Sequence, residues 1–325
     1  FFLFVLFFDF FCLLFLKKMS EFTNENEVYL LFGKNGWIGG KLIELLTLQG
    51  KTFYLAESRT YNRESVLSEI EKYKPSHILN AAGVTGRPNV DWCEDHRLET
   101  IRSNVIGTLT IADLAEEKNI HHTLFATGCI FEYDNEHQIG GQGFTEDDTP
   151  NFHGSYYSHT KAMVEDLLKA YSNTLTLRVR MPISDDLSPR NFVTKIVKYD
   201  KVVNVPNSMT VLTELLPVSL VMAQRKIKGI VNFCNPGAIS HNEVLTLYKQ
   251  YVDPDYTWSN FTLEEQDKIL KAKRSNNTLD HTRLCASVPD IHIDDIHTAM
   301  AKVMQRMRAN LEADGNYPAC LPRRA

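Results

Sequence analysis

The stretch Val28–Gly39, VYLLFGKNGWIG, decides the fold of this 325-residue chain. It begins with a short apolar run, VYLLF, which is typical of a buried parallel strand. Regularly spaced glycines follow, and apolar residues at helical spacing come after them. Because glycine has no Cβ, such a turn lets the backbone approach a pyrophosphate at the start of a helix. The stretch therefore predicts a dinucleotide site that includes Gly33, Asn35, Gly36, Trp37, Ile38 and Gly39.

The alternation of strand and helix continues from this turn to about residue 180. We expect strands at 52–56, 77–83 (ending in a loop), 122–126 and 175–179, separated by helices at 37–49, 63–73, 97–118 and 156–171. Strands that alternate with helices of this length are typical of a parallel sheet covered on both faces. The fold class predicted for residues 27–180 is therefore α/β, a doubly wound parallel sheet of the Rossmann type.

The second half of the chain is less regular. Strands are expected at 202–205 and 230–233, and helices at 191–199, 215–225, 242–251 and 263–270. We predict that residues 181–325 form mainly a smaller, interleaved substrate-binding lobe, and that residues from about 200 to 235 return to the sheet. In the first half, residues 132–154 are polar and rich in Gly and Pro, which indicates a long functional loop.

Composition and charge exclude several classes of function. The chain is 43% hydrophobic, which is ample for a large core. Its net charge of −5 comes from 35 basic and 40 acidic residues without a basic stripe, so we expect no nucleic-acid partner. The 6 cysteines form no CxxC pair and the 11 histidines no HExxH motif, so we predict neither a disulfide framework nor a metal site. A reducing, cytoplasmic location is the simplest reading.

The first residues stand apart from the rest. Residues 1–16 are almost wholly apolar apart from Asp9, and two lysines and Met19 follow them. The run is shorter than the roughly 20 residues of a membrane span, and its positive charges come after it, unlike those of a secretory signal. We expect residues 1–18 to be a translated leader or a fragment artefact and the protein to begin at Met19. Residues 1–26 as a whole are expected to be a leader or disordered tail, with no membrane association.

The residues after the second expected strand bear on the choice of cofactor. An acid there would hold the 2′-hydroxyl of NADH, whereas an arginine would accept the 2′-phosphate of NADPH. The sequence offers both, as Glu57 and Arg59. We expect NADPH, held through Arg59, and keep NADH as the alternative. The end of the third strand should also line the cofactor site, through Asn80, Ala81 and Ala82.

A phenol and an ammonium four residues apart form the second decisive pattern, Tyr157–Lys161, YSHTK. On a helix both side chains emerge from one face, and the ammonium should favour the phenolate, whose reference pKa is about 10. Thr127 lies at the carboxyl end of an expected strand, where ligands of open α/β sheets bind. We predict that Thr127 holds a substrate carbonyl, Tyr157 protonates it, and Lys161 contacts both the tyrosine and the cofactor ribose.

Four longer stretches carry a more specific resemblance, namely Asn80–Glu94, Ala126–Asp134, Arg178–Ile183 and Arg274–Asn277. On these stretches the chain resembles the extended short-chain dehydrogenases/reductases. Within them it looks like the plant-type nucleotide-rhamnose synthases, which are related to dTDP-4-dehydrorhamnose reductase. The likeness runs from about Val28 to Asp280. It implies a bifunctional 3,5-epimerase/4-reductase that converts UDP-4-keto-6-deoxy-D-glucose to UDP-L-rhamnose with NADPH, and a nucleotide-glucose 4,6-dehydratase as the functional partner that supplies the ketosugar.

The resemblance also implies roles for Cys129 and Lys195. In the related epimerase-reductases a cysteine two residues beyond the catalytic hydroxyl moves protons on the sugar ring, and by the same matching Lys195 is its partner acid. The polar residues after the third strand, Thr85, Arg87 and Asn89, are expected near the sugar. Arg190, Asn191 and Arg274 are candidates for the nucleotide diphosphate, because a planar guanidinium suits phosphate oxygens.

Two rival functions stay open at this point. One is a dTDP-4-dehydrorhamnose reductase that reduces an already epimerised sugar. The other is a non-catalytic subunit, since the regulatory subunit of methionine adenosyltransferase resembles reductases of this group. The sequence leaves open the base of the nucleotide and the oligomeric state, for which a homodimer is one option.

Overall fold

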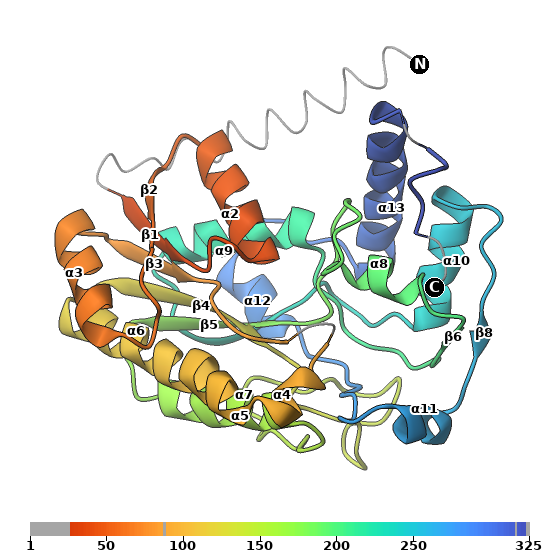
Figure 1. Ribbon diagram of the computed structural model, residues 1–325, viewed down its shortest axis with the longest axis horizontal. Coiled ribbons are helices and arrows are strands. Elements are labelled where there is room, and N and C mark those ends of the chain that lie inside the picture. Colours follow the sequence, from red (N-terminus) through yellow and green to blue (C-terminus); the bar gives the residue numbers. More distant parts are fainter. Residues whose placement is uncertain (1–26, 87–88, 316, 323–325) are drawn as a thin grey trace.

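The computed structural model describes residues 27–86, 89–315 and 317–322, so the expected leader (1–26) and the candidate Arg87 lie outside the described residues. At its centre is a six-stranded parallel sheet in the order β2-β1-β3-β4-β5-β7 (Figure 1). The strands are β1 (Val28–Phe32), β2 (Thr52–Leu55), β3 (His77–Asn80), β4 (His121–Thr127), β5 (Thr174–Val179) and β7 (Gly229–Phe233). Helices cover both faces (Figure 1), which confirms the predicted doubly wound α/β fold.

Strand β1 shows why the opening stretch is apolar throughout. Tyr29 and Leu31 belong to a core cluster that also contains residues of α2 (Trp37–Leu48), α9 (Leu212–Gln224) and α12 (Thr282–Ser287). Leu30 and Phe32 belong to another, shared with α3 (Arg63–Tyr73) and α6 (Gly107–Glu117). Successive side chains of a strand point to opposite faces, so a strand covered on both sides has no polar face.

A second core lies among helices from the later part of the chain. It contains buried residues of α8 (Phe192–Ile196), α10 (His241–Tyr251) and α13 (Ile296–Ala313), which stand together beyond the carboxyl ends of the sheet strands (Figure 1). The strand predicted at 202–205 is shorter, as β6 (Lys201–Val202), and pairs with β8 (Ser259–Asn260) in a separate sheet. Helix α11 (Leu263–Ile269) follows β8 in the chain. The strand predicted at 230–233 is β7 of the main sheet.

The long helix predicted at 97–118 is interrupted. The chain forms α4 (Trp92–Asp95), α5 (Arg97–Ile101), a π-helical turn η1 (Arg102–Ile106) and then α6. Asn104 lies in this turn and its side chain bonds both backbone groups of Val84, accepting from N and donating to O at 2.8 Å each. A π-helical turn of this kind is often found at functional sites. The two bonds of Asn104 hold the loop that follows β3 in place.

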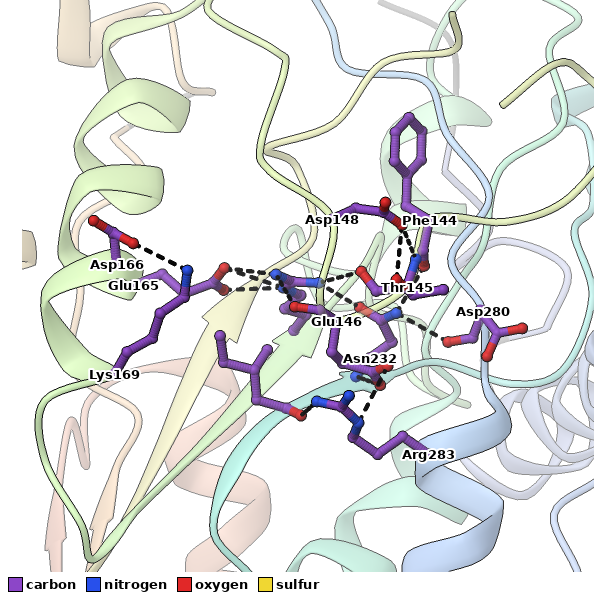
Figure 2. Close-up of polar contacts among 12 residues, drawn as sticks. Phe144, Thr145, Glu146, Asp148, Glu165, Asp166, Lys169, Asn232, Asp280 and Arg283 are labelled. Atoms are coloured by element: carbon purple, nitrogen blue, oxygen red, sulfur yellow. Dashed lines mark hydrogen bonds and ion pairs between the residues drawn. The ribbon is translucent and has the colours of Figure 1, made fainter. Parts of the chain in front are cut away.

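A buried polar network ties α7 (Tyr156–Leu168) to the sheet and to the loop at 132–154 (Figure 2). Arg178 in β5 donates to Glu165 of α7, with its Nη2 2.8 Å from Oε1, and to the carbonyl of Thr145 at 3.1 Å. Asn232 of β7 donates in turn to the carbonyl of Phe144 at 2.9 Å. The loop is thereby held to two strands.

Among the described residues, no helix combines the length and the apolar character that crossing a membrane requires.

Candidate active site

Three predicted catalytic side chains meet beyond the carboxyl end of β4. Thr127 is the last residue of that strand, and Tyr157 and Lys161 lie on one face of α7. All three are buried, with exposed fractions of 6%, 8% and 6% respectively. The Thr127 side chain interacts with the Tyr157 phenol. A hydroxyl pair, with an ammonium one turn further along α7, therefore lies at the edge of the sheet where ligands of this fold class bind.

Two contacts fix the start of α7 and so the position of Tyr157. Ser155 caps the helix by accepting from the backbone N of Ser158 at 3.1 Å. The free backbone N of Tyr156 donates to Glu94 Oε1 at 2.7 Å. Both bonds satisfy amides that the first turn of a helix leaves without an intrahelical partner.

The pKa of Tyr157 moves against the direction expected from its Lys161 neighbour. Burial raises it above its ordinary value, the nearby Cys129 adds to this, and the interaction with Thr127 opposes it. Burial also lowers the pKa of Lys161 to about 8. Desolvation penalises the charged form of each group and is the largest influence on both pKa values. Tyr157 therefore keeps its proton at neutral pH and is suited to donating it.

Cys129 lies within the same cluster and is half-buried. Its backbone N donates to Thr127 Oγ1 at 3.1 Å, which turns the chain sharply after β4. Its Sγ accepts from Nη1 of Arg180 at 3.0 Å, and the sulfur interacts electrostatically with both Tyr157 and Lys195. The sulfur is thus directed towards polar groups and not into the apolar core.

Lys195 joins this cluster from α8. Burial lowers the pKa of its ammonium, the charges of Arg190 and Arg274 lower it further, and Cys129 opposes them. Its side chain is half-buried and makes no hydrogen bond or ion pair with the described residues. A lysine with a lowered pKa releases its proton more readily, as an acid catalyst must.

The candidate substrate residues fall into two groups. Arg190 donates through Nη1 to Thr85 Oγ1 and to the Gly86 carbonyl, both at 3.1 Å, so two of the candidates touch. Arg274 forms an ion pair with Asp91 at 2.8 Å, and Asn89 accepts from the backbone N of the same Asp91 at 2.8 Å. These four side chains lie on the loop after β3 and on the segments that face it.

Asn191 has a different role from the one expected. It is fully buried and caps α8, its Oδ1 accepting from Val193 N at 3.2 Å. Its Nδ2 donates to the carbonyls of Ser184 and Asp186, both at 2.7 Å. With no exposed area and with its amide used by the backbone, this side chain is not placed to contact a diphosphate. Sequence pattern could not separate a capping asparagine from a ligand-binding one.

The glycine-spaced turn has the close packing that its sequence predicts. Gly33 has a φ of +91°, and a Cβ there would lie 2.5 Å from the carbonyl carbon of Ala81. A Cβ on Gly39 would lie 2.1 Å from the Gly33 carbonyl oxygen. Trp37 begins α2 and donates through Nε1 to Asp186 at 3.1 Å, which joins this turn to the segment before α8. Ile38 packs against the core beside it.

The neighbouring strand ends complete the candidate cofactor site. Glu57 is engaged in an ion pair with Lys34 of the turn, whereas Arg59 is exposed and its side chain makes no ion pair or hydrogen bond with the described residues. At the end of β3, Asn80 accepts from Ala82 N at 3.1 Å, and its buried Nδ2 finds no acceptor in the described chain. The free donor and the free guanidinium are both groups that a dinucleotide could use.

Sequence reasoning missed several residues that build the site. Arg180 contacts the sulfur of Cys129, and Asn277 donates through Nδ2 to the carbonyls of Gly128 and Phe131, at 3.1 and 2.9 Å, so that it holds the loop of Cys129 in place. The available signal was the closely spaced pair of arginines at the end of an expected strand, RVR at 178–180. Among the described residues, no three His, Cys, Asp or Glu side chains are grouped so as to hold a metal ion.

Comparison with known proteins bears out the resemblance. Residues 29–197 match the model of the NAD dependent epimerase/dehydratase family. The chain is 60% identical over 265 residues to an Arabidopsis thaliana protein described as a bifunctional dTDP-4-dehydrorhamnose 3,5-epimerase/dTDP-4-dehydrorhamnose reductase, covering 81% of this chain and 88% of that protein.

Two further relatives extend the comparison. A trifunctional UDP-glucose 4,6-dehydratase/UDP-4-keto-6-deoxy-D-glucose 3,5-epimerase/UDP-4-keto-L-rhamnose-reductase of Arabidopsis thaliana is 58% identical over 81% of this chain, which spans 40% of that protein's length. The crystal structure of a UDP-rhamnose synthase from Acanthamoeba polyphaga mimivirus superimposes with a TM-score of 0.82 at 39% identity, covering 86% of this chain and 99% of that one.

Proposed function

This chain belongs to the NAD dependent epimerase/dehydratase family, and we propose that it is a bifunctional 3,5-epimerase/4-reductase acting on a nucleotide-linked 4-keto-6-deoxy sugar. The observation that carries the proposal is the grouping of Cys129 with Thr127 and Tyr157, with Lys195 close by. The hydroxyls suit ketone reduction, and the sulfur and the ammonium suit proton exchange at carbon. The relatives that combine both activities support the same assignment.

Inversion at C3 and C5 requires a base and an acid on opposite faces of the sugar. The 4-keto group acidifies the hydrogens on both carbons, and the sulfur of Cys129 as a thiolate takes one of them as a proton. The charge that develops on the C4 oxygen is stabilised by the hydroxyls of Thr127 and Tyr157. Lys195 then gives a proton to the other face of the same carbon. Cys129 is left protonated and Lys195 neutral, and proton exchange with water resets both.

Reduction at C4 uses the other half of the cluster. A nicotinamide cofactor, when bound, would supply the hydride. Tyr157 gives its proton to the C4 oxygen, and its raised pKa means that it holds this proton until the oxygen becomes basic. Thr127 orients the same oxygen, and Lys161, whose pKa is about 8, lies on the adjacent turn of α7 where its ammonium can stabilise the tyrosinate that forms.

The finer assignments rest on smaller observations. The free guanidinium of Arg59, beside a Glu57 that is occupied by Lys34, favours NADPH over NADH. We propose UDP-4-keto-6-deoxy-D-glucose as the substrate and UDP-L-rhamnose as the product, with dTDP forms as the alternative. A nucleotide-glucose 4,6-dehydratase has to supply this ketosugar. We place the reaction in the cytoplasm and leave a homodimer as the option for assembly.

The test separates inversion from reduction. In D2O without cofactor, the chain should exchange hydrogen for deuterium at C3 and C5 of UDP-4-keto-6-deoxy-glucose, as followed by mass spectrometry. Addition of NADPH should then yield UDP-rhamnose. Cys129→Ser should lose the exchange and still reduce an already epimerised 4-keto-rhamnose nucleotide, while Cys285→Ser, a change at another half-buried cysteine, should behave as the unmodified chain.

Three results would overturn parts of this assignment. Reduction of the epimerised sugar without any exchange at C3 or C5 would leave a 4-reductase alone. Exchange that survives Cys129→Ser would remove the sulfur as the base. Failure of both reactions, together with co-purification of a larger catalytic chain, would favour the regulatory-subunit alternative.

A further inference from the structure

Arg180 is a fully buried arginine directly after β5. Its backbone N donates to Thr210 Oγ1 at 2.9 Å, and Thr210 N donates back to the Arg180 carbonyl at 2.8 Å, so the main chain is fixed. Its guanidinium donates to Cys129 Sγ at 3.0 Å, to the Ser275 carbonyl at 2.8 Å and to Asn207 Oδ1. The remaining Nε is buried and has no partner in the described chain.

Arg178, two residues earlier, shows what a buried arginine ordinarily requires. It pairs with the Glu165 carboxylate through Nε and Nη2, at distances from 2.8 to 3.2 Å. A buried charge is costly unless an opposite charge compensates it. Arg180 is buried to the same degree, yet it forms no ion pair with any Asp or Glu of the described residues.

The titratable groups around Arg180 do not supply the missing negative charge. Burial raises the pKa of Tyr133 and raises that of Cys234 to about 12, so both keep their protons at neutral pH. Burial lowers the pKa of His241 to about 4, which leaves its imidazole neutral. The remaining hydrogen-bond acceptors, Asn207 and the Ser275 carbonyl, are uncharged. Cys129 is the one ionisable group to which the described guanidinium donates a hydrogen bond.

We propose that Arg180 is a positioning residue whose guanidinium takes the sulfur of Cys129 as its counter-ion and so holds it as the thiolate that removes the sugar proton. The role of the thiolate rests on the proposed function, whereas the ion pair itself does not. A permanently charged, immobile donor is well suited to this, because arginine does not lose its proton in proteins. The sulfur is held ready for proton abstraction before the substrate arrives.

Other groups also face the sulfur. Tyr157 on α7 is neutral at physiological pH, because burial and the sulfur itself raise its pKa. Lys195 on α8 is a second cation near Cys129, but it makes no hydrogen bond to the sulfur. Loss of Arg180 should therefore reduce the thiolate population without abolishing it, since Lys195 still contributes positive charge.

The test measures the reactivity of Cys129 itself and needs no substrate. The chain is treated briefly with iodoacetamide across a range of pH, and the labelling of each cysteine is measured by peptide mass spectrometry. Iodoacetamide reacts with thiolates and not with thiols, so the labelling rate of a cysteine rises with pH to a plateau. The pH at half the plateau rate reports the ionisation of that cysteine, and the plateau rate reports how accessible its sulfur is to the reagent. Cys285 is the internal reference, because it is also half-buried and burial and Asp280 raise its pKa.

In the unmodified chain, the pH at which Cys129 reaches half its plateau labelling rate should lie well below the corresponding pH of Cys285. In Arg180→Met the labelling of Cys129 at pH 7 should fall about tenfold or more, with the half-plateau shifted upward. Arg180→Lys should recover part of this rate. Arg225→Met, which changes an arginine paired with Asp290, and the labelling of Cys285 should show no change.

Equal half-plateau pH values for Cys129 in the unmodified chain and Arg180→Met would overturn the proposal and leave Arg180 as a packing residue. If Arg180→Met unfolds, the buried Cys93 and Cys234 will become labelled. The unmodified chain then decides the question. A half-plateau pH of Cys129 that is not below that of Cys285 refutes the ion pair. Failure of the proposed function is separate, since it shows as absence of sugar exchange and reduction while the labelling result stands.

Discussion

Replacement of Glu165 by Gln should destabilise the chain strongly, because Glu165 compensates the buried charge of Arg178 (Figure 2). The carboxylate accepts two bonds from Arg178 Nε, at 3.0 and 3.2 Å, and one from Nη2 at 2.8 Å. The side chains are 5% and 1% exposed, so water cannot take over these bonds. Glutamine has the same shape, but it removes the charge and turns an NH2 group towards a guanidinium.

The magnitude follows from the cost of leaving one buried ion without its partner, which is about 3–5 kcal/mol. With an unfolding entropy of about 2.1 cal/mol/K per residue, this lowers the Tm of a chain of this size by roughly 4–7 °C. The neighbouring ion pair Asp166–Lys169 is the matched control on the same helix (Figure 2). Its side chains are 75% and 57% exposed, so Asp166→Asn should cost less than about 1 kcal/mol.

Urea denaturation followed by far-UV circular dichroism, together with thermal melting, measures both variants. Urea is preferable to guanidinium chloride because it does not screen charge. A loss of stability in Glu165→Gln no greater than that in Asp166→Asn would refute the reasoning. It would mean that solvent or a rearranged partner reaches Arg178 in spite of its burial.

Three further predictions concern the turn, the cofactor and pH. Gly39→Ala should destabilise the chain and weaken cofactor binding, because its Cβ would lie 2.1 Å from the Gly33 carbonyl oxygen. The control Gly40→Ala, whose Cβ would have no atom within 4 Å, should be neutral or stabilise the helix by about 1 kcal/mol. Urea denaturation measures the stability of both variants, and cofactor titration measures their binding. Arg59→Ala should raise the KM for NADPH about tenfold and change that for NADH little in steady-state kinetics; equal effects on both cofactors would contradict the 2′-phosphate assignment. Burial lowers the pKa of Lys161 from 10.5 to about 8, so its ammonium costs the folded state about 3 kcal/mol below pH 8 and nothing above pH 10.5. Lys161→Met should thus raise the Tm at pH 7, with a gain that shrinks as the pH rises through this window, and an unchanged Tm would contradict it.

The sheet could be predicted because its signals are local. Strand β1 is covered on both faces and is apolar along its whole length, and the glycines between β1 and α2 mark a turn that other residues cannot form. The position of Thr127 followed from the same pattern, because it lies at the carboxyl end of a parallel strand, where ligands of open α/β sheets bind. Helix α13 was not predicted, although the Asp295 cap and apolar residues at helical spacing indicate it.

The remaining details depend on contacts between distant residues. The interruption of the helix at 97–118 is associated with the bonds of Asn104 to Val84, twenty residues away. Arg180 has a neighbour in Cys129 that lies 51 positions earlier, and nothing in the local pattern distinguishes it from Arg178. The pKa shift of Tyr157 depends on burial, which spacing on a helix does not report, so the expected direction was wrong.

Under the proposed function, inversion draws on parts of the chain that reduction does not use. The groups for reduction lie at the end of β4 and on α7, whereas Lys195, Arg180 and Asn277 all come from beyond β5. Cys129 connects the two, because its backbone bonds to Thr127 while its sulfur accepts from Arg180. A chain that kept Thr127, Tyr157 and Lys161 but lost these later contacts would retain the hydroxyls that reduce a ketone and lose the charges that invert its neighbouring carbons. The second half therefore supplies, together with Cys129, the groups that distinguish an epimerase-reductase from a reductase alone.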